Sequence, residues 1–536
     1  MIMKKFDKKT GIFGITTMLM VLLSCTKLDE TVYDTISAED TQLSAEDLNN
    51  IIAPAFTSFR SIYWGWNGLF DDYEESSDLI VTPFRNGIGW GDLYITMHQH
   101  TWGSTLEHTE GLWSATYSGI NNVNRAIYQM EQITGVSDME KYTNELRALR
   151  AIYYYILLDN FRNVPIVTRY DLPAGFLPEQ STTKEVYDFI VSELNAVMPA
   201  LSEDNTPATY GRITRWVAKM TLAKLYLNSG VYLGTDKWAD ALAQVNEIIS
   251  SGKFSLATNY RDPFLAANEG SVEEILSIPF DVVYAPGSYY AYKTLYSDSQ
   301  KTYNLAAAPW GGSGGIPQFI DTYDTDDIRL QVSWLGGPQY TSSGEPLIME
   351  NGQQLNYINY MSTVNGTEYN EGYRFIKYEI PSGLTGNQGN DVPFYRYTDA
   401  LMIKAECLLR TGDAAGAAAI VTEIRRRDFL SKPEKATVTG AQLTSGSTYK
   451  YGEYANGQIT RFEGGADIPY GRFLDELAWE FVGEHHRKQD LIRFGVYTTK
   501  SWFSHTPNGD YRKVFPIPQS QMDANHNLKQ NDGYVN

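Results

Sequence analysis

The stretch "NELRALRAIYYYILLDNF", residues 144–161, decides the fold class. Its apolar residues recur every three or four positions, which is the period of one helix face. That face holds Leu146, Leu149, Ile152, Tyr153, Ile156 and Leu157. Arg147 and Arg150 lie off it. The pattern predicts an amphipathic helix over residues 144–161.

The same helical period continues on both sides of this stretch. It predicts helices over residues 45–62, 110–134, 182–201, 213–229, 237–251 and 472–494. Residues 392–427 repeat the layout of residues 213–251, because Ala223 precedes Gly230 by the interval that separates Ala405 from Gly412. A second helix follows each glycine, with small residues at its packing face: Ala241, Ala417 and Ala418. Such pairs are typical of degenerate tetratricopeptide repeats. The predicted fold is mostly α.

Three long stretches lack a helical pattern: residues 65–102, 255–321 and 331–390. They are rich in Gly, Asn, Tyr and Trp, and this aromatic content argues against disorder. Ordered loops of this length are usually functional. No Pro/Ser linker divides the chain, so we expect one domain in which a helical scaffold presents long, aromatic-rich loops that carry the binding face.

The N-terminus has the layout of a lipoprotein signal. Four lysines precede an apolar run over residues 11–23, which is too short to span a membrane, and Leu22-Leu23-Ser24-Cys25 follows. A cysteine directly after a small residue is the acceptor for a lipid anchor. The sequence therefore predicts a signal peptide over residues 1–24, with palmitate or a similar acyl group on Cys25 holding the mature chain, residues 25–536, on a membrane. An ordinary signal peptide with an incidental cysteine is the alternative.

Composition excludes one class of partner and one kind of framework. The chain carries 64 acidic and 44 basic residues, a net charge of -20, which argues against nucleic acid. It has two cysteines, so no disulfide framework is available once Cys25 is lipidated. Cys407 lies in an apolar helical stretch, where a buried and inert thiol is expected.

Several segments, in the same order along the chain, resemble the SusD/RagB family. They are the lipobox with its acidic sequel at residues 25–30, "WSATYSGINNVNRAI" at 113–127, "ELRALRAIYYYILLDNFRNVPIV" at 145–167, "YRYTDALMIKAECLLRTGD" at 395–413, "EFVGEHHRKQDLIRFG" at 480–495 and "VFPIPQSQMDANHNLKQNDGY" at 514–534. The resemblance implies a nutrient-binding lipoprotein exposed at the cell surface of the outer membrane. It implies a lid role over a SusC-like TonB-dependent transporter, and a domain whose N-terminal portion is 25–330 and whose C-terminal RagB/SusD portion is 331–536. It implies no particular substrate.

A glycan site needs aromatic planes for the C–H faces of the sugar and planar polar groups for its hydroxyls. Residues 63–90 and 289–318 offer both, and the resemblance implies that stacking residues come from these two portions. The predicted carbohydrate-binding residues are Trp64, Trp66, Asp72, Arg85, Asn86, Trp90, Tyr289, Tyr290 and Trp310, with Trp90 and Trp310 foremost. Trp113, Trp216, Trp238 and Trp479 lie within helical patterns and are expected in the core.

No catalytic motif emerges, and neither a cofactor nor a metal site is predicted. Asp71, Asp72, Glu74 and Glu75 could supply the carboxylate pair of a glycosidase, but no partner region is marked for them. The acids at 321–327 only partly match a calcium loop. The leading interpretation is a non-catalytic protein that captures an oligosaccharide or polysaccharide for uptake, and its sugar cannot be read from the sequence. A peptide- or protein-binding surface lipoprotein is the alternative, and a surface glycosidase is a weaker third.

Overall fold

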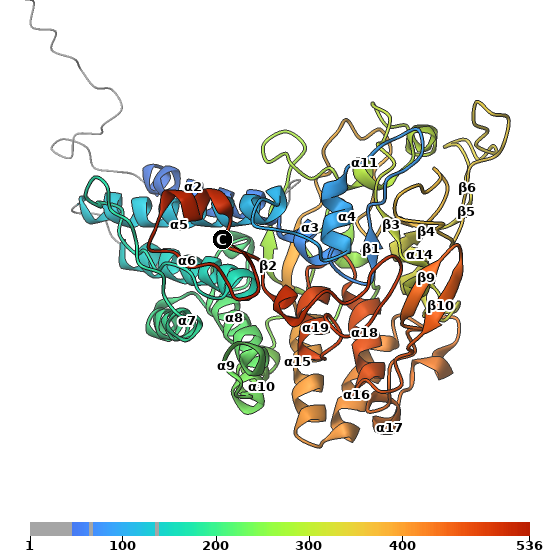
Figure 1. Ribbon diagram of the computed structural model, residues 1–536. Helices are drawn as coiled ribbons and strands as arrows, with labels where there is room; N and C mark the ends of the chain where they lie inside the picture. The colour runs from blue at the N-terminus through green and yellow to red at the C-terminus, as the bar shows by residue number, and fades with distance from the viewer. Residues whose placement is uncertain (1–44, 64–67, 134–138, 536) are drawn as a thin grey trace, which may run out of the picture.

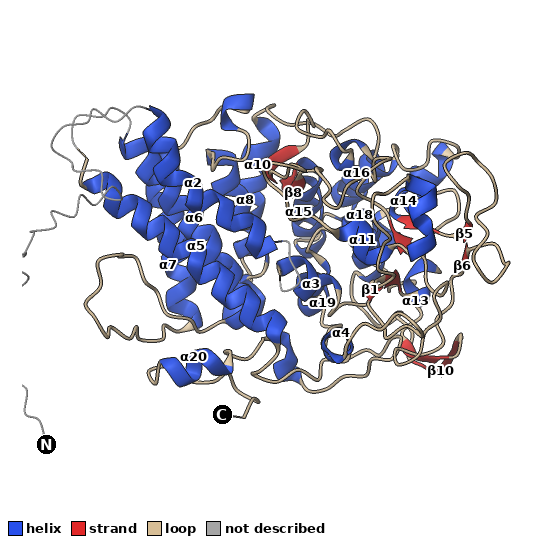
Figure 2. Cartoon of the chain, turned by 90° about the horizontal axis from the view of Figure 1, so that it is seen from above, coloured by secondary structure: helices blue, strands red, loops and turns tan. Residues whose placement is uncertain are grey.

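The structure is a computed structural model that describes residues 45–63, 68–133 and 139–535. Helices dominate it (Figures 1 and 2). The α-helices are α2 (Ala45–Tyr63), α3 (Leu69–Glu74), α4 (Asp92–His98), α5 (Glu107–Glu131), α6 (Met139–Phe161), α7 (Thr183–Val197), α8 (Arg215–Leu227), α9 (Ser229–Leu233), α10 (Trp238–Ser250), α11 (Tyr290–Thr294), α12 (Gln300–Tyr303), α13 (Pro317–Ile320), α14 (Ile328–Ser333), α15 (Tyr397–Arg410), α16 (Ala414–Arg425), α17 (Gly440–Leu443), α18 (Gly471–Phe481), α19 (Arg487–Arg493) and α20 (Gln519–Ala524).

Short strands join segments that are far apart in the sequence. They are β1 (Ile80–Val81), β2 (Glu274–Ile278), β3 (Gly314–Gly315), β4 (Trp334–Leu335), β5 (Gly337–Pro338), β6 (Asn356–Tyr357), β7 (Arg374–Phe375), β8 (Val392–Arg396), β9 (Gly452–Ala455) and β10 (Gln458–Phe462). All pair antiparallel in twos, as β1–β3, β2–β8, β4–β7, β5–β6 and β9–β10. The β1–β3 pair places Ile80 opposite Gly315, so the two predicted binding regions meet there.

Helix α6 lies at the centre of the N-terminal helices. It packs between α5 and α7, and α2 packs on α5. The apolar stripe predicted from residues 144–161 is buried, as expected. The rest of this stretch is buried as well, except for the half-buried Arg147. Arg150 is enclosed by Glu193 and Asn124, at 3.0 and 2.7 Å from its guanidinium nitrogens. The helix is thus surrounded by protein, and its polar residues are satisfied by neighbouring helices.

The two predicted helix pairs are present. Helix α8 packs against α10, α15 packs against α16, and α10 joins the two pairs by packing on α15. Ala241 and Ala417 are fully buried where the helices approach each other, and Ala418 is nearly so. The mostly α fold is therefore confirmed, while the tetratricopeptide character of the pairs stays a prediction.

Two of the predicted boundaries are wrong. Residues 472–494 form two helices, α18 and α19, rather than one. The first helix ends because the chain turns at Gly483, whose φ of +76° lies outside the helical region. Only glycine fits at this turn, because an added Cβ would lie 2.1 Å from the Phe375 ring. Residues 392–396 form strand β8, which is buried on both faces and pairs with β2, so the helix begins only at Tyr397.

Where the structure describes them, the stretches that lack a helical pattern fold into short elements, most of them in the half of the molecule away from α7 (Figure 2). Residues 68–83 are buried rather than exposed. The chain then returns to the N-terminal helices, where the Phe515 amide donates to the Asn160 carbonyl at 2.8 Å. Of the helices in the described ranges, none is long and apolar enough to cross a membrane.

A buried network of ion pairs holds α18 in the interior. The Glu480 carboxylate lies 2.9 Å from Arg396, 2.6 Å from Arg427 and 3.4 Å from Arg329. Burial alone would raise the pKa of Glu480, but these arginines hold it well below its ordinary value. The network joins α14, β8 and the segment after α16 to α18, so these parts of the chain pack as one unit.

Candidate functional site

Three aromatic side chains from the two predicted binding regions lie together, and we call Trp90, Tyr289 and Trp310 the aromatic platform. The Trp310 ring centroid is 6.2 Å from that of Tyr289, and the Trp90 Nε1 donates to the Trp310 carbonyl oxygen at 3.0 Å. Trp310 is 36% exposed and Tyr289 is 38% exposed, while Trp90 is half-buried. Tyr292 supports them from within, with its ring centroid 5.7 Å from Trp310.

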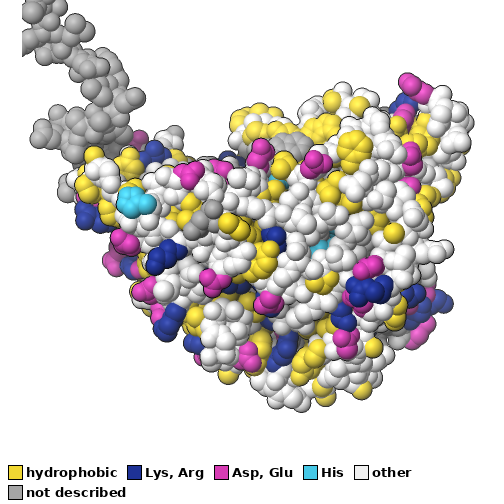
Figure 3. Space-filling model, in the orientation of Figure 1, with side chains coloured by type: hydrophobic (Ala, Val, Ile, Leu, Met, Phe, Trp, Pro, Cys, Tyr) yellow, Lys and Arg dark blue, Asp and Glu magenta, His cyan; other side chains and the backbone are white. Residues whose placement is uncertain are grey.

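Exposed hydrophobic side chains are concentrated along the same segment. Those between residues 282 and 310 are Val282, Val283, Tyr284, Tyr289 and Trp310. Figure 3 shows hydrophobic side chains along the upper edge of the molecule, over the region of α11 and α4 in Figure 1. A patch of this kind on a water-facing surface marks a site of contact with a ligand or a partner.

The backbone of residues 310–312 is held against α11. The amide of Trp310 donates to the Tyr292 carbonyl at 2.7 Å, and the amide of Gly312 donates to the Lys293 carbonyl at 2.6 Å. Gly312 has no room for a side chain, because a Cβ there would lie 2.7 Å from the Trp90 ring and 2.9 Å from the Lys293 oxygen. This glycine is what lets Trp90 reach the platform.

Trp90 has a strained backbone. Its φ is +70°, in the left-handed region that a bulky residue rarely occupies. Gly87 and Gly89 before it also have positive φ. Such strain costs on the order of 1–3 kcal/mol and is found where the surrounding structure holds it for a purpose. Here it turns the indole toward Trp310.

Arg85 holds the platform loops together from inside the protein. Its Nε donates to the Gly312 carbonyl at 2.8 Å, and one Nη donates to the carbonyls of Glu368 and Glu371 at 2.8 and 2.9 Å. The side chain is fully buried, and burial lowers its pKa. Arg85 is therefore a positioning residue, and its burial removes it from the binding surface.

A second buried cluster fixes α11 to α3. The Lys293 ammonium lies 2.7 Å from Asp71 and 2.8 Å from Glu75, and Tyr94 donates to Asp71 at 2.9 Å. Burial alone would lower the pKa of Lys293, but the two carboxylates raise it overall. The two carboxylates thus pair with the Lys293 ammonium in the interior, and no residue of this cluster is exposed.

The remaining predicted residues divide by exposure. Asp72 and Tyr290 are buried, the latter edge-on against Phe70 and Phe375. Asn86 is exposed, and its amide donates to the Glu368 carboxylate at 2.7 Å. Cys25, Trp64 and Trp66 lie outside the described residues.

The tryptophans within helical patterns and Cys407 were also predicted to be buried. Trp113, Trp216 and Trp479 are buried as predicted, and Trp238 is half-buried against the same core. Cys407 is buried with a free thiol, and burial raises its pKa to about 12.

A cleft beside the platform was not predicted. Its volume of about 520 Å³ lies within the usual range of the ligand pockets of proteins. Tyr296 and Tyr369 form its aromatic wall, with ring centroids 5.1 Å apart, and Asp298, Gln300 and Asn351 supply polar groups. We call it the tyrosine cleft. Ala308 in its lining is two residues from Trp310, so cleft and platform share one segment.

The family models match nearly the whole described chain. The SusD family matches residues 250–534, and the family described as starch-binding and associating with the outer membrane matches residues 75–227. The chain belongs to the SusD family.

Relatives of known name agree with this assignment. The starch-binding protein SusD of Bacteroides thetaiotaomicron is 25% identical over 81% of this chain and 80% of its own length. A SusD-like protein of Bacteroides ovatus is 28% identical over 44% of each chain.

Solved structures share the fold. Surface glycan-binding protein A of Bacteroides thetaiotaomicron, in complex with laminarihexaose, has a TM-score of 0.68 at 21% identity and covers 91% of this chain and 100% of its own. A SusD superfamily protein of Parabacteroides distasonis has a TM-score of 0.71 at 20% identity and covers 92% and 100%. The mostly helical fold is thus that of the SusD family.

Proposed function

We propose that this protein captures a glycan at the cell surface and that it does so on the aromatic platform. The supporting observation is the meeting of Trp90 with Tyr289 and Trp310 in one partly exposed aromatic surface, although Trp90 and Trp310 are 220 residues apart in the sequence. Flat aromatic rings match the C–H faces of pyranoses, and the tyrosine cleft beside them adds amide and carboxylate groups for hydroxyls. The names of a starch-binding and a laminarihexaose-bound relative support the same ligand class.

We further propose that the protein is not an enzyme. Asp71 and Glu75, which could have served as a carboxylate pair, are buried against Lys293 and have no access to a ligand. Asp72 is buried as well. Incubation with oligosaccharides followed by an assay for new reducing ends tests this. Release of reducing ends by the purified protein would contradict it.

Retention on native affinity gels containing starch, laminarin, xylan or mannan tests glycan capture. At least one of these polymers is expected to slow the migration of the wild-type protein. The Trp310→Ala variant is expected to migrate in that gel as far as it does in a gel without polymer. Trp238→Ala, a half-buried tryptophan on α10, is the matched control and should keep the wild-type retention. Binding of a peptide mixture, without retention of the protein by any of the four polymers, would favour the peptide-binding alternative instead.

The lipid anchor and the transporter belong to the same proposal. A lipid on Cys25 holds the protein on the outer membrane, where it acts as a lid and delivers glycan to a SusC-like TonB-dependent transporter. Cys25→Ala should move the protein from the membrane fraction to the soluble fraction and abolish labelling by a palmitate analogue. The lipidated protein should co-purify with a TonB-dependent transporter after mild detergent extraction, and recovery of the protein without one would contradict the lid role.

A further inference from the structure

A second cavity lies on the N-terminal helices, far from the aromatic platform. It has a volume of about 670 Å³ and runs between α5, the loop at residues 165–178 and the C-terminal segment at residues 521–528. We call it the neutral groove. It is lined by Trp113, Ser114, Tyr117, Ser118, Asn121, Asn122, Pro165, Val167, Pro178, Gln521, Asn525 and Leu528. Figures 1 and 2 both place α5 and α11 in different parts of the molecule, so the groove is separate from the platform.

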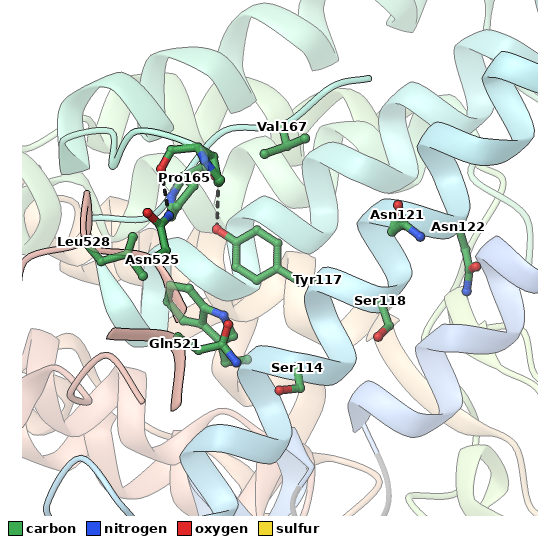
Figure 4. Close-up of a pocket in the computed structure, with 12 residues that line it drawn as sticks. Ser114, Tyr117, Ser118, Asn121, Asn122, Pro165, Val167, Gln521, Asn525 and Leu528 are labelled. Carbon is green, nitrogen blue, oxygen red and sulfur yellow. Dashed lines mark hydrogen bonds between the residues drawn. The ribbon is translucent and has the colours of Figure 1, made fainter. Parts of the chain in front are cut away.

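Helix α5 presents a row of small polar side chains to this groove. Ser114, Ser118 and Asn121 follow one another along one face of the helix, as Figure 4 shows, and all three are exposed. At a rise of 1.5 Å per residue this row is about 10 Å long, which is enough for a short oligosaccharide. Hydroxyls and side-chain amides both donate and accept hydrogen bonds, as sugar hydroxyls do.

Hydrogen bonds hold in place the wall of the groove that lies opposite α5. The Tyr117 hydroxyl donates to the Pro165 carbonyl at 2.8 Å, and the Asn525 amide donates to the Pro178 carbonyl at 2.8 Å (Figure 4). The rings of Trp113 and Tyr117 lie beside each other, with centroids 4.9 Å apart. The groove therefore combines aromatic carbon surface with hydrogen-bonding groups on walls that neighbouring segments hold in place.

The charge of the lining selects among sugars. All twelve lining side chains are uncharged. A ligand that carries a carboxylate or sulfate would lose water there without gaining a counter-charge, and the net charge of -20 on the chain would repel it further. A purely apolar ligand would leave the serine and asparagine groups without partners.

We propose that the neutral groove is a second carbohydrate-binding site, specific for uncharged oligosaccharides. It binds independently of the aromatic platform and gives one protein two points of attachment to a polymer. Two such points would raise the avidity for a long chain above that of either site alone. Short oligosaccharides would occupy the sites one at a time.

The test isolates the groove by removing the platform. A double variant, Tyr289→Ala with Trp310→Ala, is titrated in saturation-transfer NMR with maltohexaose, laminarihexaose, cellohexaose, xylohexaose and mannohexaose, and with a hexamer of galacturonic acid. At least one neutral hexasaccharide should bind and the galacturonic acid hexamer should not. Adding Ser118→Phe, which fills the groove from an exposed position, should weaken that binding at least about tenfold.

The matched control is Ser192→Phe, an exposed serine on α7 outside the groove. In the same platform-free background it should leave the affinity within about twofold. Equal unfolding midpoints for Ser118→Phe and Ser192→Phe establish that both proteins are folded. Replacing Asn121 and Gln521 together with alanine gives a second groove variant, which removes polar groups without adding bulk and should also weaken binding.

The outcomes separate this proposal from the proposed function. If no neutral hexasaccharide binds the platform-free protein, or if binding survives both groove variants, the second site is refuted while the platform stands. If Ser118→Phe abolishes binding in the wild-type background and the platform variants change nothing, the platform is refuted while the groove stands. Preference of the groove for the galacturonic acid hexamer, or for a peptide mixture, would overturn its assignment.

Discussion

Replacing Gly312 with alanine should disable the aromatic platform while leaving the rest of the fold in place. The new Cβ would lie 2.7 and 2.8 Å from two atoms of the Trp90 ring and 2.9 Å from the Lys293 carbonyl oxygen. Ordinary van der Waals contact begins only at 3.4 Å, so one of these groups must move. The Lys293 oxygen is held by the hydrogen bond from the Gly312 amide, whereas Trp90 is half-buried and can swing outward. Trp90 would then lose its hydrogen bond to the Trp310 carbonyl.

Overpacking of this kind costs about 1–3 kcal/mol in unfolding free energy. Because the displaced indole belongs to the platform, glycan affinity should also fall, by about tenfold or more. Gly270→Ala is the matched control, since Gly270 is exposed and a Cβ there would meet nothing within 4 Å. Urea denaturation and calorimetric titration with the retained glycan measure both quantities. If Gly312→Ala matches Gly270→Ala in stability and in affinity, then Trp90 is not held at the platform in the way described.

Three further predictions concern the interior. Arg85→Met should lower the unfolding free energy by about 2–5 kcal/mol in urea, since buried carbonyls such as that of Gly312 lose their donor; a change below 1 kcal/mol would contradict its positioning role. Burial raises the pKa of Glu74 from 4.5 to about 8, so the folded state binds the extra proton and stability should fall as the pH rises between these values. Glu74→Gln should reduce that slope, to which the Asp428 carboxyl also contributes because burial raises its pKa to about 8 as well. An unchanged slope would show that Glu74 is not among its sources. Ile152→Ala, in the fully buried centre of α6, should cost about 2–5 kcal/mol in chemical denaturation, against about 0.5 kcal/mol or less for the exposed Leu430→Ala.

Much of the helical scaffold could be predicted because its information is local. The apolar period of residues 144–161 fixes α6, and the glycine at 412 marks the turn between α15 and α16. The break between α18 and α19 could not be predicted, because it depends on Gly483 meeting Phe375, a contact across more than a hundred residues. The strand at 392–396 likewise depends on its pairing with β2.

The candidate site was predictable in part. Trp90 and Trp310 stood out because each is flanked by glycine in an aromatic loop, and the structure brings them together with Tyr289. Asp72 and Arg85 looked like ligand-binding groups because nothing in the sequence shows that residues 68–83 and Arg85 are buried. The pairing of Tyr296 with Tyr369 in the tyrosine cleft is a tertiary contact with no local signal.

The most direct test of glycan capture on the platform is a calorimetric titration of wild-type protein and Trp310→Ala with the polysaccharide that retards the wild type on gels. Trp310 is 36% exposed, so replacing its side chain should leave the unfolding midpoint nearly unchanged. Truncating a central aromatic contact typically costs 2 kcal/mol or more in binding, and the predicted result is therefore a loss of about 30-fold in affinity. Equal affinities for the two folded proteins would contradict the assignment of the platform.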